Sequence, residues 1–409
     1  MVESEVVTET LARDSVHHAR EHFAPVFADI AAGARDREVD RVLPVDAVEA
    51  LKRTGFGALR VPVEFGGWGL DWTAITALWI DLAASDANLT QALRGHFTFA
   101  EDVLFRYRAG EPVHRWFERL VAGDLVGNAW TETGTTTIDR VQTEVRSVDG
   151  RLVVDGRKYY TTGTIFAEWA DVYARFGEDP VIVLVDTRQP GVSVHDDWDG
   201  FGQRGTGTGT TEFHEASVDD LVPFGNRHPY QTALYQLNHL ASLAGITRAV
   251  LTDVTREVQE RERNFSHANA SRVRDDPQVL ARVGEIWASA YATEALALKV
   301  AEAIDAAAAV DPNDADGLQT ASERAELESS AAQVTASQLA IDAASNLFDT
   351  LGASAVSTAR ALDRHWRNAR TVASHNPRIF KAKVLGAYQV NGTPPPYAWG
   401  IGRTERTER

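Results

Sequence analysis

The pattern of hydrophobic residues changes twice along this chain, and these changes limit the fold. Residues 125–225 contain short alternating runs rich in β-branched residues, such as "PVIVLVDT" and "TTEFHEASV", separated by turns such as "VDG" and "QPG". Before and after this segment, apolar residues recur at helical spacing, and the last part predicts four long alanine-rich helices that suit a bundle. The sequence therefore predicts an α+β protein.

The two changes also place the expected domain boundaries. We predict an N-terminal helical domain over residues 1–124, a central strand-rich domain over residues 125–225 and a C-terminal helical domain over residues 226–409. A chain of 409 residues is long enough for two or three packed units. Its last residues, "GRTERTER", predict a flexible tail.

Composition excludes several classes of function. A net charge of −17 disfavours binding to nucleic acid or to an anionic membrane. The chain has no cysteine, which excludes disulfides, thiolate catalysis and cysteine-ligated metals, and we predict no metal site. No apolar run reaches the roughly 18–20 residues of a membrane span, and the polar N-terminal segment lacks a signal core. These features predict a cytoplasmic protein.

The common catalytic motifs are absent. The sequence has no P-loop, no H-E-x-x-H and no G-x-S-x-G. The glycine-rich stretch "RGTGTGTT" (204–211) does not fit G-x-G-x-x-G and lies between predicted strands. We interpret it as a turn between strands and not as a phosphate cradle.

Five segments resemble, in order and spacing, the signature segments of the acyl-CoA dehydrogenase superfamily. They are "RVPVEFGGWGL" (60–70), "WTETG" (130–134), "GRKYYTTG" (156–163), "FGQRGTGTGTTEF" (201–213) and "ERERNF" (260–265). The resemblance spans nearly the whole chain. It implies that the strand-rich domain is a β-barrel, that the C-terminal domain is a four-helix bundle and that a flavin binds between them. It also implies a homotetramer.

The catalytic base of a dehydrogenase is missing from both places where that family keeps it. In most members a glutamate follows an "R-[DN]-A-[KR]" segment, which here reads "RNAR" (367–370), and the matching position is held by Val372. Other members carry the base near "QLNHLASLAG" (236–245), which contains no acid. A valine cannot accept a proton, so the chain is more similar to the flavin-dependent monooxygenase branch of the family.

The resemblance to the monooxygenase branch implies FMN as cofactor, with FAD as the alternative. The segment "FDTLGASAV" (348–356) lacks the paired glycines with which FAD-binding members hold adenosine. Arg263, two residues before Phe265, stands where the branch is expected to hold the phosphate, a role suited to a guanidinium. Ser354 is a second candidate for the phosphate.

The same resemblance implies the active-site residues. The branch receives reduced FMN from a separate flavin reductase and adds O2 to the flavin as a 4a-hydroperoxide. The expected catalytic residues, which would hydrogen-bond the oxygen or move a proton, are His96, Asn128, Thr161 and His375. The expected contacts to the flavin, besides Arg263 and Ser354, are Trp130, Thr131 and Thr162. Val372 and Ala100 replace a histidine and a tyrosine that relatives often keep at these positions.

The sequence therefore predicts a two-component monooxygenase that oxygenates a small hydrophobic molecule at sulfur, nitrogen or carbon. Two alternatives stay open: an FAD-dependent acyl-CoA dehydrogenase with a relocated base, and a non-catalytic relative that binds no flavin. The expected partners are the substrate, O2, the reductase and further copies of the chain, with no nucleic acid and no membrane.

Overall fold

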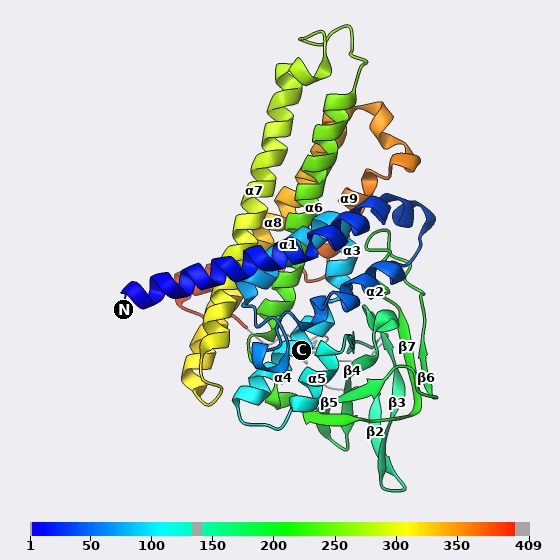
Figure 1. Ribbon diagram of the computed structural model, residues 1–409, viewed down its shortest axis with the longest axis vertical. Helices are drawn as coiled ribbons and strands as arrows, with labels where there is room; N and C mark the ends of the chain where they lie inside the picture. The colour runs from blue at the N-terminus through cyan, green and yellow to red at the C-terminus, as the bar shows by residue number, and fades with distance from the viewer. Residues whose placement is uncertain (1, 133–140, 397–409) are drawn as a thin grey trace, which may run out of the picture.

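The computed structural model describes residues 2–132 and 141–396 of the chain. Long helices form one half of the molecule, and a single sheet lies beside their lower end in Figure 1. The predicted flexible tail, "GRTERTER", lies outside the described residues. Helices and strands follow one another as the sequence predicts, so the three-part α–β–α layout is present. The exact boundaries at residues 124 and 225 stay a prediction.

The first part of the chain is helical and leads into the sheet. Its helices are α1 (Val2–Asp40), α2 (Val45–Arg53), α3 (Trp72–Ala92), α4 (Arg94–Arg108) and α5 (His114–Val121). The strands are β1 (Val126–Ala129), β2 (Glu144–Val148), β3 (Arg151–Tyr159), β4 (Trp169–Phe176), β5 (Asp179–Asp186), β6 (Val192–Val194), β7 (Thr210–Ser217) and β8 (Asp220–Pro223). Helix η3 (Thr164–Phe166) is a short 3₁₀ turn between β3 and β4.

The sheet is open. Its strands run in the order β6-β7-β3-β2-β4-β5-β8, and β1 pairs in parallel with β4. The two edge strands, β6 and β8, do not pair with each other in the described part of the chain, so the predicted β-barrel is not closed here. Alternating residues predict where strands form, but they do not specify whether two short edge strands meet.

Three long helices dominate the C-terminal part. They are α6 (Gln231–Glu260), α7 (Pro277–Ala309) and α8 (Ala315–Leu351), followed by the shorter α9 (Asp363–Val372) and α10 (Lys381–Asn391). Buried alanines such as Ala301 and Ala336 let these helices approach closely. Helix α3 lies along α6, where a Cβ on Gly245 would come 2.4 Å from the Cβ of Ala83. The predicted fourth long helix is only the ten residues of α9.

Two acids cap the start of α3 and tie it to α7. Asp71 accepts a hydrogen bond from the backbone N–H of Ala74 at 2.7 Å. Asp305, on α7, accepts from the N–H groups of Trp72 at 2.6 Å and Thr73 at 3.0 Å, and from the Thr73 hydroxyl at 2.7 Å. Asp305 therefore satisfies the free N–H groups of one helix from another, and so links the first and last parts of the fold.

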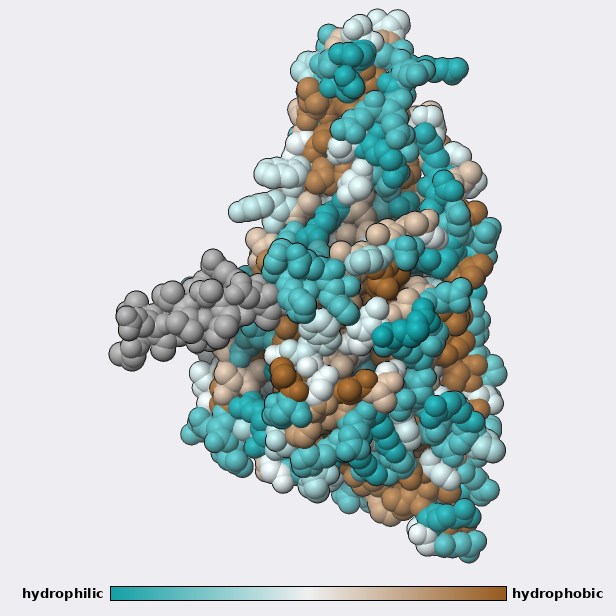
Figure 2. Space-filling model, viewed as in Figure 1, coloured by the Kyte–Doolittle hydropathy of each residue, from teal (hydrophilic) through white to brown (hydrophobic). Residues whose placement is uncertain are grey.

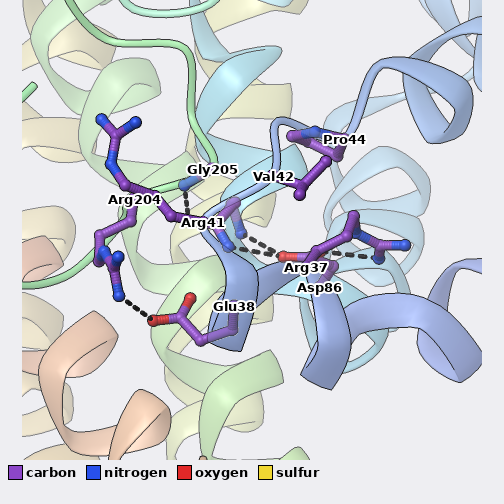
Figure 3. A pocket seen from close by; sticks show the side chains of 9 residues that line it. Arg37, Glu38, Arg41, Val42, Pro44, Asp86, Arg204 and Gly205 are labelled. Carbon is purple, nitrogen blue, oxygen red and sulfur yellow. Dashed lines mark hydrogen bonds and ion pairs between the residues drawn. The ribbon is translucent and has the colours of Figure 1, made fainter. Parts of the chain in front are cut away.

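A break in α3 at Asp86 brings the loop before β7 against the helix. Asp86 has φ −157° and ψ 106°, and its carboxylate accepts from Arg37 at 2.9 Å and from the Asn88 amide at 2.8 Å. Asn88 in turn accepts from the N–H of Gly205 at 3.1 Å. Figure 3 shows these side chains around a recess of about 10 Å³, which has room for about one water molecule. The break therefore fixes the 195–209 connection.

The surface agrees with the acidic composition. Most of the face in Figure 2 is hydrophilic, with smaller hydrophobic areas between the polar side chains. In the described ranges, none of the helices combines the length and the apolar character needed to cross a bilayer.

Asp305→Ala should lower the free energy of unfolding by about 1–2 kcal/mol, because three donors at the start of α3 lose their acceptor. Urea denaturation followed by circular dichroism measures this loss. Glu302→Ala is the matched control on α7, since Glu302 forms only an exposed pair with Lys299, and it should cost less than about 0.5 kcal/mol. Equal losses in the two variants would reject the capping role.

Candidate functional site

Asn128 is buried in β1, and one of its side-chain polar atoms has no hydrogen-bond partner. The residue is 8% exposed, and its Nδ2 donates a long hydrogen bond of 3.5 Å to the carbonyl of Tyr160. Tyr160 has φ 64°, a turn that directs the chain away from the end of β3. The side-chain Oδ1 of Asn128 is buried and has no hydrogen-bond partner. A buried acceptor without a donor is costly, so this atom suits a ligand that brings an N–H or O–H.

The two predicted threonines make different contacts. The Thr161 hydroxyl donates to the carbonyl of Gly209 at 2.9 Å and accepts from Thr211 at 2.8 Å, so its proton is already used inside the sheet. The Thr162 hydroxyl lies 2.9 Å from that of Thr208, which lies 2.7 Å from that of Thr206. The Thr206 hydroxyl donates to the carbonyl of Gln203 at 2.9 Å, so Thr208 donates to Thr206 and Thr162 donates to Thr208. The oxygen of Thr162 keeps a lone pair and can accept a hydrogen bond.

His96 is bound on both sides of its ring. Its Nδ1 accepts from the N–H of Val126 at 3.2 Å, and its Nε2 lies 2.7 Å from the carbonyl of Gly57, to which it donates. Burial lowers the pKa of His96 to about 4, so the ring is neutral near pH 7. Both nitrogens are occupied by the backbone, so the ring connects α4 to the start of β1 and has no free atom for a substrate proton.

Trp130 and Thr131 follow Asn128 directly. The Trp130 N–H donates to Asp171 at 3.1 Å, and the guanidinium of Arg227 lies 4.4 Å from the centre of the indole ring. The backbone carbonyl of Thr131 accepts from the N–H of Tyr159 at 2.9 Å. Asn128, Trp130, Thr131 and Thr162 are therefore brought together where β1 and β3 end.

His375 lies just after α9. It faces the place where β1 and β3 end, called the junction below, from the other side. Its Nε2 is 3.4 Å from Nη2 of Arg94, and its ring centre is 4.3 Å from that of His239. The residue is exposed to solvent, yet neighbouring protein atoms crowd it, and this desolvation together with the Arg94 charge lowers its pKa well below the usual range. His375 is therefore neutral at physiological pH.

A row of rings and cations links His375 to the β1 residues. The Arg94 guanidinium lies 4.8 Å from the centre of the Tyr235 ring, and that ring is 6.1 Å from Trp130. Next to Arg94, Gly95 lies so close to Asn128 that a Cβ on it would be 3.1 Å from the amide oxygen. The structure thus brings His375 and Asn128 to one junction between α4, α6 and the sheet.

Arg263 and Ser354 lie elsewhere. Both are exposed at the far end of the bundle, which is the top of Figure 1, where Phe265 approaches Gly352 and Arg261 donates to the carbonyl of Leu351. Along α6, 21 residues separate His239 from Glu260, which is roughly 30 Å at 1.5 Å per residue. This is longer than a flavin mononucleotide, so within one chain these two residues cannot share a mononucleotide with Asn128.

Sequence reasoning missed part of the junction. Arg94, Tyr235 and His239 contribute to it, and Gln236 accepts from the Asn376 amide at 2.9 Å. The polar residues of "QLNHL" lie within an apolar part of the sequence and could have indicated this site. Polar side chains on the buried face of a helix usually have a structural or functional role. Val372, at the position of the dehydrogenase base, is 4% exposed and packs in the helix core.

A larger recess lies away from these residues. It has a volume of about 390 Å³ between α2 and η3 and is lined by the ion pair of Lys52 and Glu168, whose atoms are 2.7 Å apart. Among the side chains that the structure describes, no group of three histidines and acids is arranged to hold a metal.

Comparisons with known proteins identify the family. Sequence models for the three domains of acyl-CoA dehydrogenases match residues 8–124 (N-terminal domain), 127–216 (middle domain) and 237–377 (C-terminal domain). Together they cover most of the chain. The protein therefore belongs to the acyl-CoA dehydrogenase family.

Individual relatives narrow the branch. A dibenzothiophene monooxygenase of Mycolicibacterium goodii is 28% identical over 85% of this chain and 87% of its own length. The probable FMNH2-dependent monooxygenase SfnC of Pseudomonas putida is 28% identical over 94% of this chain and 97% of its own length. The crystal structure of FMN-bound TdsC from Paenibacillus sp. A11-2 has a TM-score of 0.84 at 25% identity and covers 93% of this chain and 99% of TdsC. The predicted resemblance to the monooxygenase branch is confirmed.

His96→Asn should reduce the sensitivity of the fold to acid. Unfolded histidine binds a proton below pH 6.5, but folded His96 binds one only below about pH 4. The stability that depends on neutral His96 is therefore complete above pH 6.5 and is lost as the pH falls towards 4. Between these values the variant should lose stability less steeply, by up to about 1.4 kcal/mol per pH unit.

Urea denaturation at several pH values measures this slope. His96→Asn should be less stable than the native protein at pH 7, because the contact to Gly57 is lost. The matched control is His17→Asn, since His17 is exposed on α1, and its slope should equal that of the native protein. An unchanged slope in His96→Asn would contradict a neutral, structural His96.

Proposed function

We propose that this protein is a two-component monooxygenase that uses externally reduced FMN and O2 to oxygenate a small hydrophobic molecule at sulfur, nitrogen or carbon. One observation carries the proposal: among the residues that the structure describes, the carboxylates around the junction are engaged. Glu101 pairs with Arg60 at 2.5 Å, and Glu132 pairs with Lys158 at 2.8 Å. Asp102 pairs with Arg227 and with His228, and Asp171 accepts from Trp130 and lies 3.6 Å from Arg227. None of these carboxylates is free to take the α-proton of an acyl thioester.

The residues at the end of β1 fit a flavin ring. An isoalloxazine presents N–H and carbonyl groups along one edge, and the unpartnered Oδ1 of Asn128 and the oxygen of Thr162 supply acceptors for its N–H groups. Trp130 and Thr131 would line the ring. When bound in its reduced form, FMN supplies the two electrons with which O2 is activated.

The side chains of the junction would provide hydrogen bonding, proton transfer and positioning. We assign Asn128 to hydrogen bonding at the reacting oxygen and His375 to holding or passing a proton, because its ring is neutral and open to solvent. Thr161 and His96 are positioning residues in this proposal. Thr161 fixes the loop at Gly209, and His96 fixes the start of β1.

The distance between the junction and the far end of the bundle supports a homotetramer. Arg263 and Ser354 would hold the FMN phosphate of a neighbouring copy, because they lie too far from Asn128 in their own chain. The outer face of α7 carries the exposed rings of Trp287 and Tyr291, which are 60% and 70% exposed. Exposed aromatic rings of this kind are typical of surfaces that bind another protein.

The proposal requires a partner enzyme. A separate flavin reductase would supply the reduced FMN, the form on which the relative SfnC depends according to its name. We also propose a cytoplasmic location, since a diffusing reduced flavin requires the reductase in the same compartment. The alternative of an FAD-dependent dehydrogenase is disfavoured by Val372 and by the engaged carboxylates.

Purified protein tests the proposal when it is supplied with FMN, a flavin reductase and a panel of sulfides and amines. We expect the released flavin to be FMN and each product to contain one oxygen atom from O2. Oxidation of acyl-CoA by an artificial acceptor without O2 would reject the monooxygenase. A protein that binds neither FMN nor FAD would reject both enzyme functions.

Asn128→Ala should uncouple the reaction, because the reacting oxygen loses a hydrogen-bond partner. Loss of one such contact typically costs about 10²–10³-fold in rate. Product formation per FMNH2 consumed should fall, and hydrogen peroxide should rise. Asn391→Ala, at the exposed end of α10, is the control and should stay coupled. Full coupling in Asn128→Ala would remove Asn128 from the catalytic set.

Arg263→Ala should weaken FMN binding by about 10–100-fold, the usual effect of losing a charged hydrogen bond. Binding of riboflavin, which lacks the phosphate, should be unchanged. Fluorescence titration measures both affinities, and Arg272→Ala is the control because Arg272 lies in the same loop but pairs with Asp275 at 2.8 Å. Equal losses for FMN and riboflavin would contradict the phosphate role.

A further inference from the structure

Arg94 is a buried cation without an acid. It is 7% exposed, and its Nε has no hydrogen-bond partner. Among the side chains that the structure describes, no carboxylate lies within ion-pair distance, and the hydrogen bond that it does make is to His375. Burial lowers the pKa of Arg94, but a guanidinium stays protonated near neutral pH. A buried charge of this kind is costly unless a counter-ion reaches it.

Two other arginines of the same region show that the fold normally supplies that counter-ion. Arg60 binds Glu101 at 2.5 Å. Arg227, which is 6% exposed, binds Asp102 and lies 3.6 Å from Asp171. Arg94 is as deeply buried as Arg227, yet none of the described carboxylates pairs with it. The chain has a net charge of −17, so the lack of an acid at Arg94 is a local exception.

The surroundings of Arg94 suit an oxyanion. His239 is 1% exposed, and neither of its ring nitrogens has a hydrogen-bond partner. Its ring lies 4.3 Å from that of His375 at an angle of 46°, and the N–H of neutral His239 is available as a donor. The Nε2 of His375 accepts from Arg94, and its Nδ1–H faces the amide oxygen of Asn376 at 3.4 Å.

The location favours the substrate over the cofactor as the missing anion. The residues that fit the flavin ring, Asn128 and Thr162, belong to the sheet, whereas Arg94 belongs to α4 and touches His375. The phosphate of FMN is assigned to Arg263 at the far end of a neighbouring copy. An anion beside His375 would lie next to the proposed proton group, which is where the molecule to be oxygenated must sit.

We propose that Arg94 and His239, beside His375, bind an oxyanion group of the substrate, so that the substrate is a small organic anion such as a carboxylate. This inference rests on the proposed function, because it concerns the substrate side of the same junction. The ring of Tyr235, 4.8 Å from the Arg94 guanidinium, would pack against the apolar part of the molecule. The substrate is then amphipathic, with an anionic end and an apolar body.

Binding measurements test the inference without turnover. Benzoate and benzamide have nearly the same shape, and only benzoate is charged. In calorimetric titrations of the FMN-loaded protein, benzoate should bind at least about 10-fold more tightly than benzamide, as expected for charged hydrogen bonds. Arg94→Met should abolish this preference, and Arg94→Lys should restore part of it. Arg378→Met is the control, since Arg378 contacts Gln338 on the outer face of α8, and it should keep the preference.

Thermal unfolding without ligand separates a binding role from a structural one. Removing an uncompensated buried charge should leave the melting temperature of Arg94→Met equal to or above that of the native protein. Arg227→Met, which leaves Asp102 and Asp171 without a cation, should melt at a lower temperature. A large loss of stability in Arg94→Met would show that Arg94 is structural and would overturn the inference.

The remaining outcomes distinguish this inference from the proposed function. Equal binding of benzoate and benzamide overturns the substrate class, even if the protein oxygenates neutral sulfides. A loss of FMN affinity in Arg94→Met with an unchanged preference for benzoate assigns Arg94 to the cofactor and also overturns it. A preference for benzoate that depends on Arg94 supports the inference, and it does so even if no oxygenation is found, in which case the proposed function alone fails.

Discussion

The ion pairs of Arg227 hold the three parts of this fold together. Arg227 comes from the segment between the sheet and α6, Asp102 from α4 and Asp171 from β4. The guanidinium also covers the ring of Trp130. Burial raises the pKa of Asp171 to about 6, and the neighbouring cation opposes this shift. This cluster also places the junction residues. Trp130 donates to Asp171, Asn128 lies on β1, which pairs with β4, and Tyr235 lies on α6, which follows Arg227 in the chain.

In this member of the family, the described acids around the junction are paired with basic side chains. In the described part of the junction, each of the four carboxylates Glu101, Asp102, Glu132 and Asp171 lies within ion-pair distance of an arginine, a lysine or a histidine, while the position of the dehydrogenase base is a buried valine. In the described part of the chain, the polar atoms without a hydrogen-bond partner include the Oδ1 of Asn128, both ring nitrogens of His239 and the Nε of Arg94. Such a set hydrogen-bonds oxygen and anions well and abstracts a proton from carbon poorly.

Much of the fold was predictable because hydrophobic periodicity is a local property. The strand-rich segment and the long helices follow directly from it. The open sheet and the short α9 were not, since they depend on contacts between distant segments. Trp130, Thr131 and Thr162 lie together at one junction, as expected for residues within signature segments, and Asn128, just before one of these segments, lies there too. The hydrogen bonds that occupy His96 and Thr161 could not be predicted from the sequence. The partners of a hydroxyl or an imidazole depend on which distant segments the fold brings beside it. The importance of Arg94 was hidden for the same reason: an unpaired charge is defined by what is absent around it.

The length of α6 links the association of copies to the binding of flavin. If the ring of FMN binds at the junction of one copy and its phosphate at the bundle tip of another, flavin binding and association are linked equilibria. Each then strengthens the other by the same free energy, because the linkage is reciprocal. Dilution would release the flavin, and excess flavin would hold the copies together. Cofactor occupancy would then report the concentration of the protein itself.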